Sequence, residues 1–415
     1  MTFDASTRNA PHYWSKRQSV RALGLAALLL ALGTFPVSAR VATEDPSSEQ
    51  PPEATVEAVP VAGPFEFPWS AAFLPDGAVL VTERPGRLQL LATPSERREV
   101  SGLPPVFSNV EHGHAGLLDV AIDPQFADNS RIYLSYVHGS AGHSTLRVAR
   151  ATLDLPRAEL TNIEVIFESN AGDKPELYGA RMALSPHGYL FLTLGDRWQP
   201  AKAQDITQTT GTIIRIHSDG SIPTDNPFVF EIPEARPEIW SYGHRNPLGL
   251  ALDADGRLWS HENGPQGGDE LNLIEPGRNY GWPVISHGLE YAEPPPSGHG
   301  QPRTIVGTAR EGMEQPVHHW TPAIAPSGLA VENADEALVF WIGALRGNAL
   351  VRLEMQNREI LQEQHIFAQE LGRIRDVRIA SDGQLYLLTD GPEGFLYRID
   401  PLIEQVSRDK DRERL

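Results

Sequence analysis

The residue types best suited to chemistry cluster in one part of the chain. Arg245 and Asn246 stand side by side, and the run GPQGGDE follows at 264–270. Calcium and other hard cations take carboxylate and main-chain carbonyl oxygens from irregular, glycine-rich loops. The run therefore indicates a calcium site. The alternative is that Asp269 and Glu270 only cap turns.

Arginines and tryptophans form a second group of candidates. A guanidinium holds a carboxylate through two hydrogen bonds, so several arginines together indicate a polyanionic ligand. For any single arginine, a surface salt bridge is the alternative. Trp282 and Trp320 offer flat surfaces for a ligand ring, or they simply belong to the core. The arginines concerned are Arg245, Arg346, Arg373 and Arg375.

These residues are distributed over a repeated strand–turn–strand phrase. Turns such as Asp-Gly between alternating apolar strands are strong hairpin signals. Six such units predict an all-β, six-bladed β-propeller of four-stranded antiparallel blades, with a double β-sandwich as the alternative. The long insertion 264–320 would help to build a ligand site on one face. The phrases occupy 71–83, 119–136, 181–196, 249–264, 328–343 and 376–390.

The first residues have the features of an export signal. Basic residues precede the apolar run 22–33, and a small-residue site follows, with cleavage near Ala39. The run is too short to span a bilayer, although a retained membrane anchor is the alternative. We therefore predict a periplasmic or secreted protein without a membrane span in its mature form. The predicted parts are a signal peptide at 1–39, a Pro/Glu-rich linker at 40–62, the propeller at 63–402 and a disordered charged tail at 403–415.

Charge and composition narrow the function classes. The formal net charge of −19 argues against nucleic-acid partners, which require basic surfaces, and suits a small neutral or cationic ligand. The chain has no cysteine, which excludes disulfides, thiolate nucleophiles, cysteine-ligated zinc and c-type haem.

Six motifs, taken in order, resemble the soluble aldose dehydrogenases that depend on pyrroloquinoline quinone (PQQ), also called glucose/sorbosone dehydrogenases. The resemblance extends over about 67–400. It implies a propeller with the quinone at its mouth and calcium beside it. The implied reaction is oxidation of an aldose or related alcohol at the anomeric hydroxyl by hydride transfer to the quinone, with an unknown electron acceptor. The motifs are GHRNP (243–247), GPQGGDELN (264–272), NYGWP (279–283), GMEQP (312–316), IAPSGLA (324–330) and RIRDV (373–377).

The resemblance also implies roles for individual residues. Arg245 acts in catalysis and contacts the quinone together with Asn246. Calcium is held either by the carbonyls of Gly264 and Pro265 or by Glu270 and the carbonyl of Tyr280. The other implied quinone contacts are Tyr291 beside the cofactor, Trp320 over its ring, Arg346 near a basic loop, and Arg373 with Arg375 on its carboxylates.

The chain departs from the family at the catalytic base. The family has a His-His pair where this chain has Glu176 and Leu177, and leucine cannot take a proton. Glu176 could act as the base if burial raised its pKa, although it stands one residue from the family's base. His114 occupies a family glutamine position and is a second candidate base. A third departure is Leu248, where the family has glutamine.

Three hypotheses remain open at this level. The first is an active quinoprotein dehydrogenase with a relocated base. The second is a non-catalytic propeller that binds quinone or a sugar because the histidine is absent. The third is a calcium-dependent lactonase on the same fold, because a fold alone does not define a function.

Overall fold

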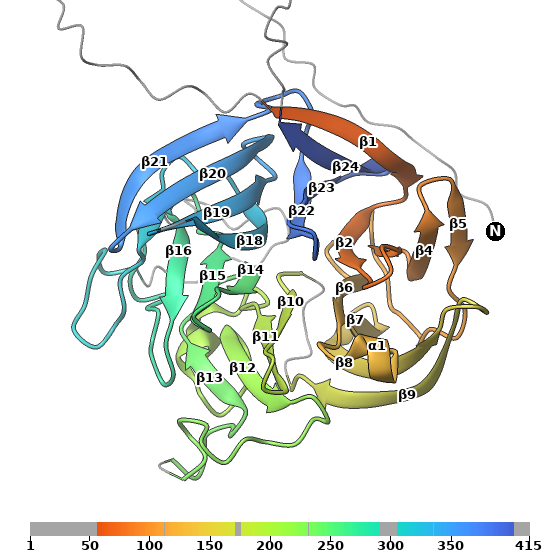
Figure 1. Cartoon of the computed structure of the whole chain (residues 1–415). Helices are drawn as coiled ribbons and strands as arrows, with labels where there is room; N and C mark the ends of the chain where they lie inside the picture. Colours follow the sequence, from red (N-terminus) through yellow and green to blue (C-terminus); the bar gives the residue numbers. More distant parts are fainter. Residues whose placement is uncertain are drawn as a thin grey trace, which may run out of the picture. The chain divides into compact units, whose positions relative to one another are not determined.

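The structure is a computed structural model, and it describes residues 56–111, 113–170, 176–230, 232–289, 305–334 and 336–401. The predicted signal peptide and the whole predicted tail lie outside the described residues. The described chain forms six four-stranded antiparallel sheets. They surround a central axis as the blades of a propeller (Figure 1), which confirms the predicted fold.

The first three blades follow one another along the chain, each with its strands in sequence order. Blade 1 holds β2 (Pro68–Phe73), β3 (Val79–Glu83), β4 (Arg87–Thr93) and β5 (Glu96–Glu99). Blade 2 holds β6 (Leu117–Ile122), β7 (Arg131–Ser140), β8 (His143–Asp154) and β9 (Glu159–Glu168), with helix α1 (Phe126–Asn129) between β6 and β7. Blade 3 holds β10 (Gly179–Leu184), β11 (Tyr189–Leu194), β12 (Thr212–His217) and β13 (Ile239–Tyr242), with the 3-10 helix η1 (Pro200–Gln204) after β11.

The remaining blades complete the ring. Blade 4 holds β14 (Pro247–Leu252), β15 (Leu258–Glu262), β16 (Asp269–Ile274) and β17 (His318–Trp320). Blade 5 holds β18 (Pro326–Ala334), β19 (Ala337–Ala344), β20 (Ala349–Gln356) and β21 (Glu359–Ile366). Blade 6 holds β22 (Ile374–Ile379), β23 (Leu385–Thr389), β24 (Gly394–Pro401) and, as its fourth strand, β1 (Val56–Phe65).

The turn chemistry explains the innermost hairpins. Gly77 closes the β2–β3 turn and Gly383 closes the β22–β23 turn, with φ of 89° and 83°. This left-handed backbone region is open to glycine at no steric cost. Each Asp-Gly therefore reverses the chain directly after an inner strand.

Blade 6 closes the ring with strands from both ends of the described chain. β1 pairs antiparallel with β24, from Val56 opposite Pro401 to Phe65 opposite Gly394. Residues 56–62, which we predicted to be linker, therefore belong to the propeller. Pro60 and the Pro/Glu-rich run before this segment are typical of a linker, but β24 offers it a strand edge to pair with.

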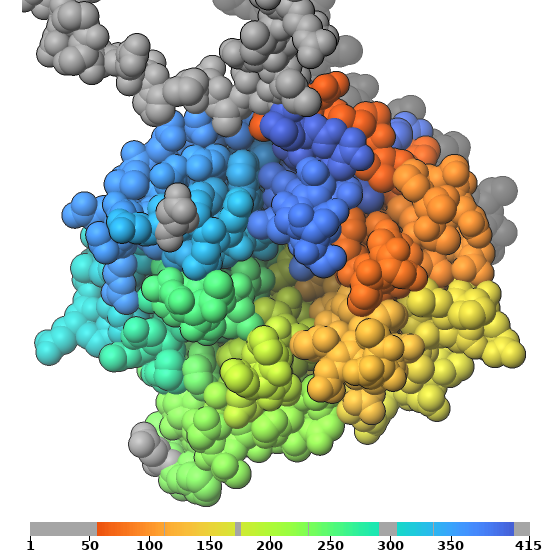
Figure 2. Space-filling model, viewed as in Figure 1, coloured from red at the N-terminus to blue at the C-terminus, as the bar shows by residue number. Residues whose placement is uncertain are grey.

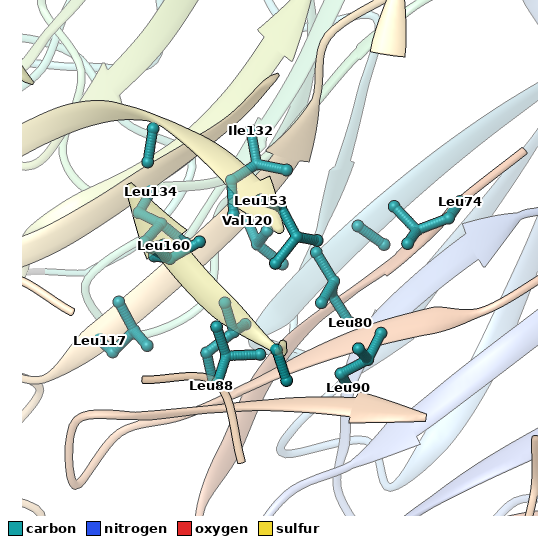
Figure 3. Packing of buried hydrophobic residues seen from close by; sticks show 14 of the residues in the cluster. Leu74, Leu80, Leu88, Leu90, Leu117, Val120, Ile132, Leu134, Leu153 and Leu160 are labelled. Atoms are coloured by element: carbon teal, nitrogen blue, oxygen red, sulfur yellow. The ribbon is translucent and has the colours of Figure 1, made fainter. Parts of the chain in front are cut away.

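The core lies between neighbouring blades. The cluster between blades 1 and 2 consists of side chains such as Leu80, Leu90, Leu134 and Leu153 (Figure 3), each at most 2% exposed. The blades pack as successive sectors of the ring (Figure 2). Each blade is thereby held in place by its two neighbours.

A buried ion-pair network joins the inner strands of four blades. Arg181 lies 3.3 Å from Asp119 and 2.9 Å from Asp376, and Arg378 lies 2.8 Å from both carboxylates. Ser70 donates to Asp119 at 2.6 Å. Arg181 also lies over the ring of Trp69, 4.1 Å from its centroid. These contacts tie blades 1, 2, 3 and 6 together near the axis.

Candidate functional site

A cavity of about 150 Å³ lies where the inner strands begin, and all six blades contribute to its wall. Its polar lining comprises three arginines, one histidine and two asparagines. No Asp or Glu of the described residues lines it. The lining residues are Trp69, Arg84, His114, Leu118, Leu177, Tyr178, Gly179, Asn246, Leu248, Asn263, Leu345, Arg373 and Arg375.

Two of the predicted cofactor residues, Arg373 and Arg375, meet at this cavity through a shared carboxylate. Asp390, which follows β23, accepts from Arg373 at 2.9 Å and pairs with Arg375 at 3.0 Å. Burial alone would raise the pKa of Asp390, but the positive charges of Arg375 and Arg373 outweigh it and lower that pKa to about 2. Asp390 therefore stays ionised and orients both guanidinium groups.

Arg84 is a third arginine in this wall, and our sequence reasoning missed it. It follows β3 directly, is 8% exposed, and donates through Nη1 to the carbonyl of Gly113 at 2.9 Å. Burial and the charges of Arg375 and Arg373 lower the pKa of Arg84 to about 10. The signal was present, because Arg84 stands directly after the first repeat phrase, as the other arginines stand near the ends of theirs.

His114 faces the same space. Its ring is open to the cavity yet lies deep among protein atoms, and Nδ1 accepts from the amide of Leu177 at 3.3 Å. Burial and the charges of Arg375 and Arg84 lower the pKa of His114 to about 4. The ring is therefore neutral at pH 7. With Nδ1 as the acceptor, Nε2 carries the proton and can donate to a ligand.

Arg245 lies beside this cavity, clamped by two tryptophans. Its guanidinium is 5.5 Å from the ring centroids of both Trp198 and Trp282, and Nη1 donates to the carbonyl of Asn263 at 2.9 Å. Buried Asp196 accepts from the indole of Trp282 at 2.8 Å and from the amide of Trp198 at 2.9 Å. Burial raises the pKa of Asp196 to about 6. This arrangement fixes where the guanidinium points.

Asn263 contacts both predicted cofactor residues that follow β13, Arg245 and Asn246. Its side-chain oxygen lies 3.3 Å from Nδ2 of Asn246, and its own amide donates to the carbonyl of Pro326 at 3.0 Å. Asn246 also accepts from the amide of Gly179 at 3.3 Å. Asn263 was not among our sequence candidates.

The glycine loop between β15 and β16 is closely packed. Asp269 accepts from the amides of Gly264, Ile324 and Ala325, each at 2.8 Å. A side chain on Gly264 would clash with the carbonyl of Gly267. Asp269 therefore anchors the loop, which agrees with the turn-capping alternative for this residue.

Glu270 lies next to a second carboxylate at this loop. A small pocket is lined by Gly264, Glu270, Tyr280, Glu262 and Arg245, among others. Burial and the charge of Glu262 raise the pKa of Glu270 well above its ordinary range. The described part of the chain holds no group of three Asp, Glu or His side chains arranged to bind a metal. Calcium here would therefore need main-chain carbonyls in addition to Glu270.

The model of the glucose/sorbosone dehydrogenase family matches residues 65–398. The chain belongs to this family. It is 37% identical over 361 residues to the aldose sugar dehydrogenase of Escherichia coli, covering 84% of this chain and 94% of that protein. The apo-form crystal structure of the E. coli soluble aldose sugar dehydrogenase superposes with a TM-score of 0.76 at 35% identity, covering 84% of this chain and all of that one. The PQQ-bound structure of the aldose sugar dehydrogenase from Streptomyces coelicolor superposes with a TM-score of 0.66 at 28% identity, covering 84% of this chain and 99% of that one.

In this member of the family, the two candidate bases occupy different environments. Leu177, with φ of 52°, is 5% exposed and lines the cavity. The side chain of Glu176 accepts from the indole of Trp198 at 2.6 Å and is not part of the cavity wall. Of the two, His114 therefore faces the space that a substrate could enter.

Two residues implied by the family resemblance lie away from the cavity, and a third cannot be placed in the described structure. Trp320 is buried in the core between blades 4 and 5, and its indole donates to Glu363 on β21 at 3.0 Å. Arg346 is exposed on the β19–β20 turn and does not line the cavity. Tyr291 lies outside the described residues. The roles of all three toward the quinone stay predictions.

No helix among the described residues is long and apolar enough to cross a membrane.

Proposed function

We propose that this glucose/sorbosone dehydrogenase oxidises an aldose or a related alcohol at the anomeric hydroxyl, with PQQ as the oxidant and calcium beside it. The observation that carries the proposal is the arginine-rich cavity wall formed by Arg84, Arg373 and Arg375. PQQ is a planar tricarboxylate, and guanidinium groups are the side chains that bind carboxylates with two hydrogen bonds. The donor set therefore fits the cofactor.

The chain's own residues would bind and orient the reactants. Arg373 and Arg375, preorganised by Asp390, would hold carboxylates, and Arg245 would present its charge from between two indole rings. Either Glu270 with the carbonyl of Tyr280, or the carbonyls of Gly264 and Pro265, would hold calcium. When bound, PQQ would supply the two-electron oxidant, polarised by calcium.

Proton handling by His114 would limit turnover. Its Nε2–H can orient a substrate oxygen, but a pKa of about 4 makes the ring a weak proton acceptor. Nδ1, the atom with the free lone pair, already accepts from Leu177. We therefore expect slow sugar oxidation compared with a relative that has histidine at position 177.

A second candidate function, quinone binding without turnover, is favoured by one observation. Leu177 fills the position of the family's base and lines the cavity without any group that can take a proton.

Reconstitution with PQQ and calcium tests both candidates. Dye reduction with aldoses and simple alcohols, lowered in His114→Ala, supports the first. Quinone binding without dye reduction on any substrate would refute the first and support the second. Lactone hydrolysis with calcium alone would point instead to a lactonase.

A further inference from the structure

Arg84 carries a positive charge that no carboxylate of the described chain pairs with. The nearby carboxylate is Asp390, and its ion pairs go to Arg373 and Arg375. The polar contacts of the Arg84 side chain are one hydrogen bond to the Gly113 carbonyl and a cation–π contact, 5.2 Å from the ring centroid of Phe67. Its Nε is buried and has no hydrogen-bond partner.

This arrangement is costly unless an anion joins it. Three guanidinium groups and one carboxylate leave a surplus of two positive charges around one small cavity. Like charges repel strongly where water is excluded, and a buried donor without an acceptor adds its own desolvation penalty. The mutual repulsion is felt by Arg84, because Arg375 and Arg373 lower its pKa.

The neutral lining favours a flat, multiply charged ligand over a simple ion. Trp69, Leu118 and Leu177 present apolar surface, while the amides of Asn246 and Asn263 can donate or accept. A ligand with an apolar body and carboxylates at its edge would match both kinds of surface.

We propose that Arg84 is a third anion-binding residue of this cavity, and that Arg84, Arg373 and Arg375 together select a ligand with at least two carboxylates. The inference deepens the proposed function, on which it rests for the identity of the ligand as PQQ. The selection itself is a property of these arginines and can be measured with a redox-inactive polycarboxylate.

The test measures the binding of citrate, acetate and PQQ to the full chain by calorimetry. The proteins compared are wild type, Arg84→Gln, Arg84→Lys and the control Arg131→Gln. Arg131 is exposed on β7 and does not line the cavity, so its replacement removes an equal charge elsewhere. Because a hydrogen bond to a charged group contributes substantially to binding, Arg84→Gln should lower the affinity for citrate and for PQQ roughly 10- to 100-fold. Arg84→Lys should lose less, because it keeps the charge, and Arg131→Gln should bind like wild type. Acetate should bind far more weakly than citrate throughout.

The NMR titration of His114 gives a second readout, which a purely structural role of Arg84 would not move. Because Arg84 is one of the cations that lower the pKa of His114, that pKa should rise in Arg84→Gln and stay low in Arg84→Lys. If Arg84→Gln does not fold, Arg84→Lys against wild type still tests the loss of citrate affinity.

The outcomes separate this inference from the proposed function. Folded Arg84→Gln with wild-type affinity for citrate and PQQ overturns the inference, even if the enzyme oxidises sugars. Citrate binding that depends on Arg84, in a chain that does not bind PQQ, supports the inference and overturns the proposed function.

Discussion

Replacing Asp390 by asparagine should destabilise the protein by an amount that depends on pH. The side chain is 8% exposed, and its partners lower its pKa from the ordinary 3.8 to about 2. At about 1.4 kcal/mol for each tenfold change in proton affinity, this contributes about 2 kcal/mol to the free energy of unfolding at pH 7. The asparagine would keep the shape of the side chain but not its charge.

The sign follows from the lowered pKa. Because the folded protein binds this proton less tightly than the unfolded chain, the stabilisation is complete above about pH 4 and is lost as the pH falls toward 2. At pH 3 about half of it should remain. Asp390→Asn should therefore be less stable than wild type by about 2 kcal/mol at pH 7 and by about half as much at pH 3.

Urea unfolding of both proteins at pH 7 and pH 3 measures the effect. The control is Asp255→Asn, which removes an exposed ion pair with Arg257 and should cost less than about 1 kcal/mol. An Asp390→Asn penalty that is the same at both pH values, or no larger than the control's, would refute the electrostatic reasoning.

Three further predictions concern the site. Leu177→His should raise the kcat for PQQ-dependent dye reduction roughly 100-fold, because it restores a proton acceptor in the cavity wall, and an unchanged kcat would count against a missing base. Glu176→Gln should leave kcat within about twofold, because the amide oxygen can still accept from Trp198, and a large loss would identify Glu176 as the base. Saturating calcium should raise Tm by about 2 °C or more in wild type but not in Glu270→Gln, as measured by thermal denaturation, and equal shifts in both proteins would remove Glu270 from the calcium site.

The propeller could be predicted because its signals are local. Each repeat phrase holds a buried inner strand, a turn and a second strand within a few residues, as in 376–390 around Gly383. β1 gave no such signal. Its sequence becomes a strand only beside β24, a partner at the far end of the described chain.

The parts of the candidate site that depend only on residue type could be predicted from the sequence. The parts that depend on the direction in which a side chain points could not. Arg373 and Arg375 are close in sequence and meet one carboxylate, so their grouping could be anticipated. The direction of Glu176 depends on Trp198, which belongs to the next loop of the blade. Likewise, the low pKa of His114 arises from burial and from arginines on blades 1 and 6. Only the folded ring brings those charges to the histidine.

The chain has no cysteine, so no disulfide can hold the ring closed; the pairing of β1 with β24 does so instead. Among the described strands, β1 leaves the ribosome first and β24 last, so the ring cannot close until synthesis of the last strand is complete. Until then, β1 has no strand to pair with, and blade 1 lacks one of its two neighbours. Unravelling from either end must in turn begin by pulling a strand out of blade 6. The β1–β24 pairing therefore sets when the ring can close during synthesis. It also protects the two terminal strands from proteases that attack unpaired chain ends.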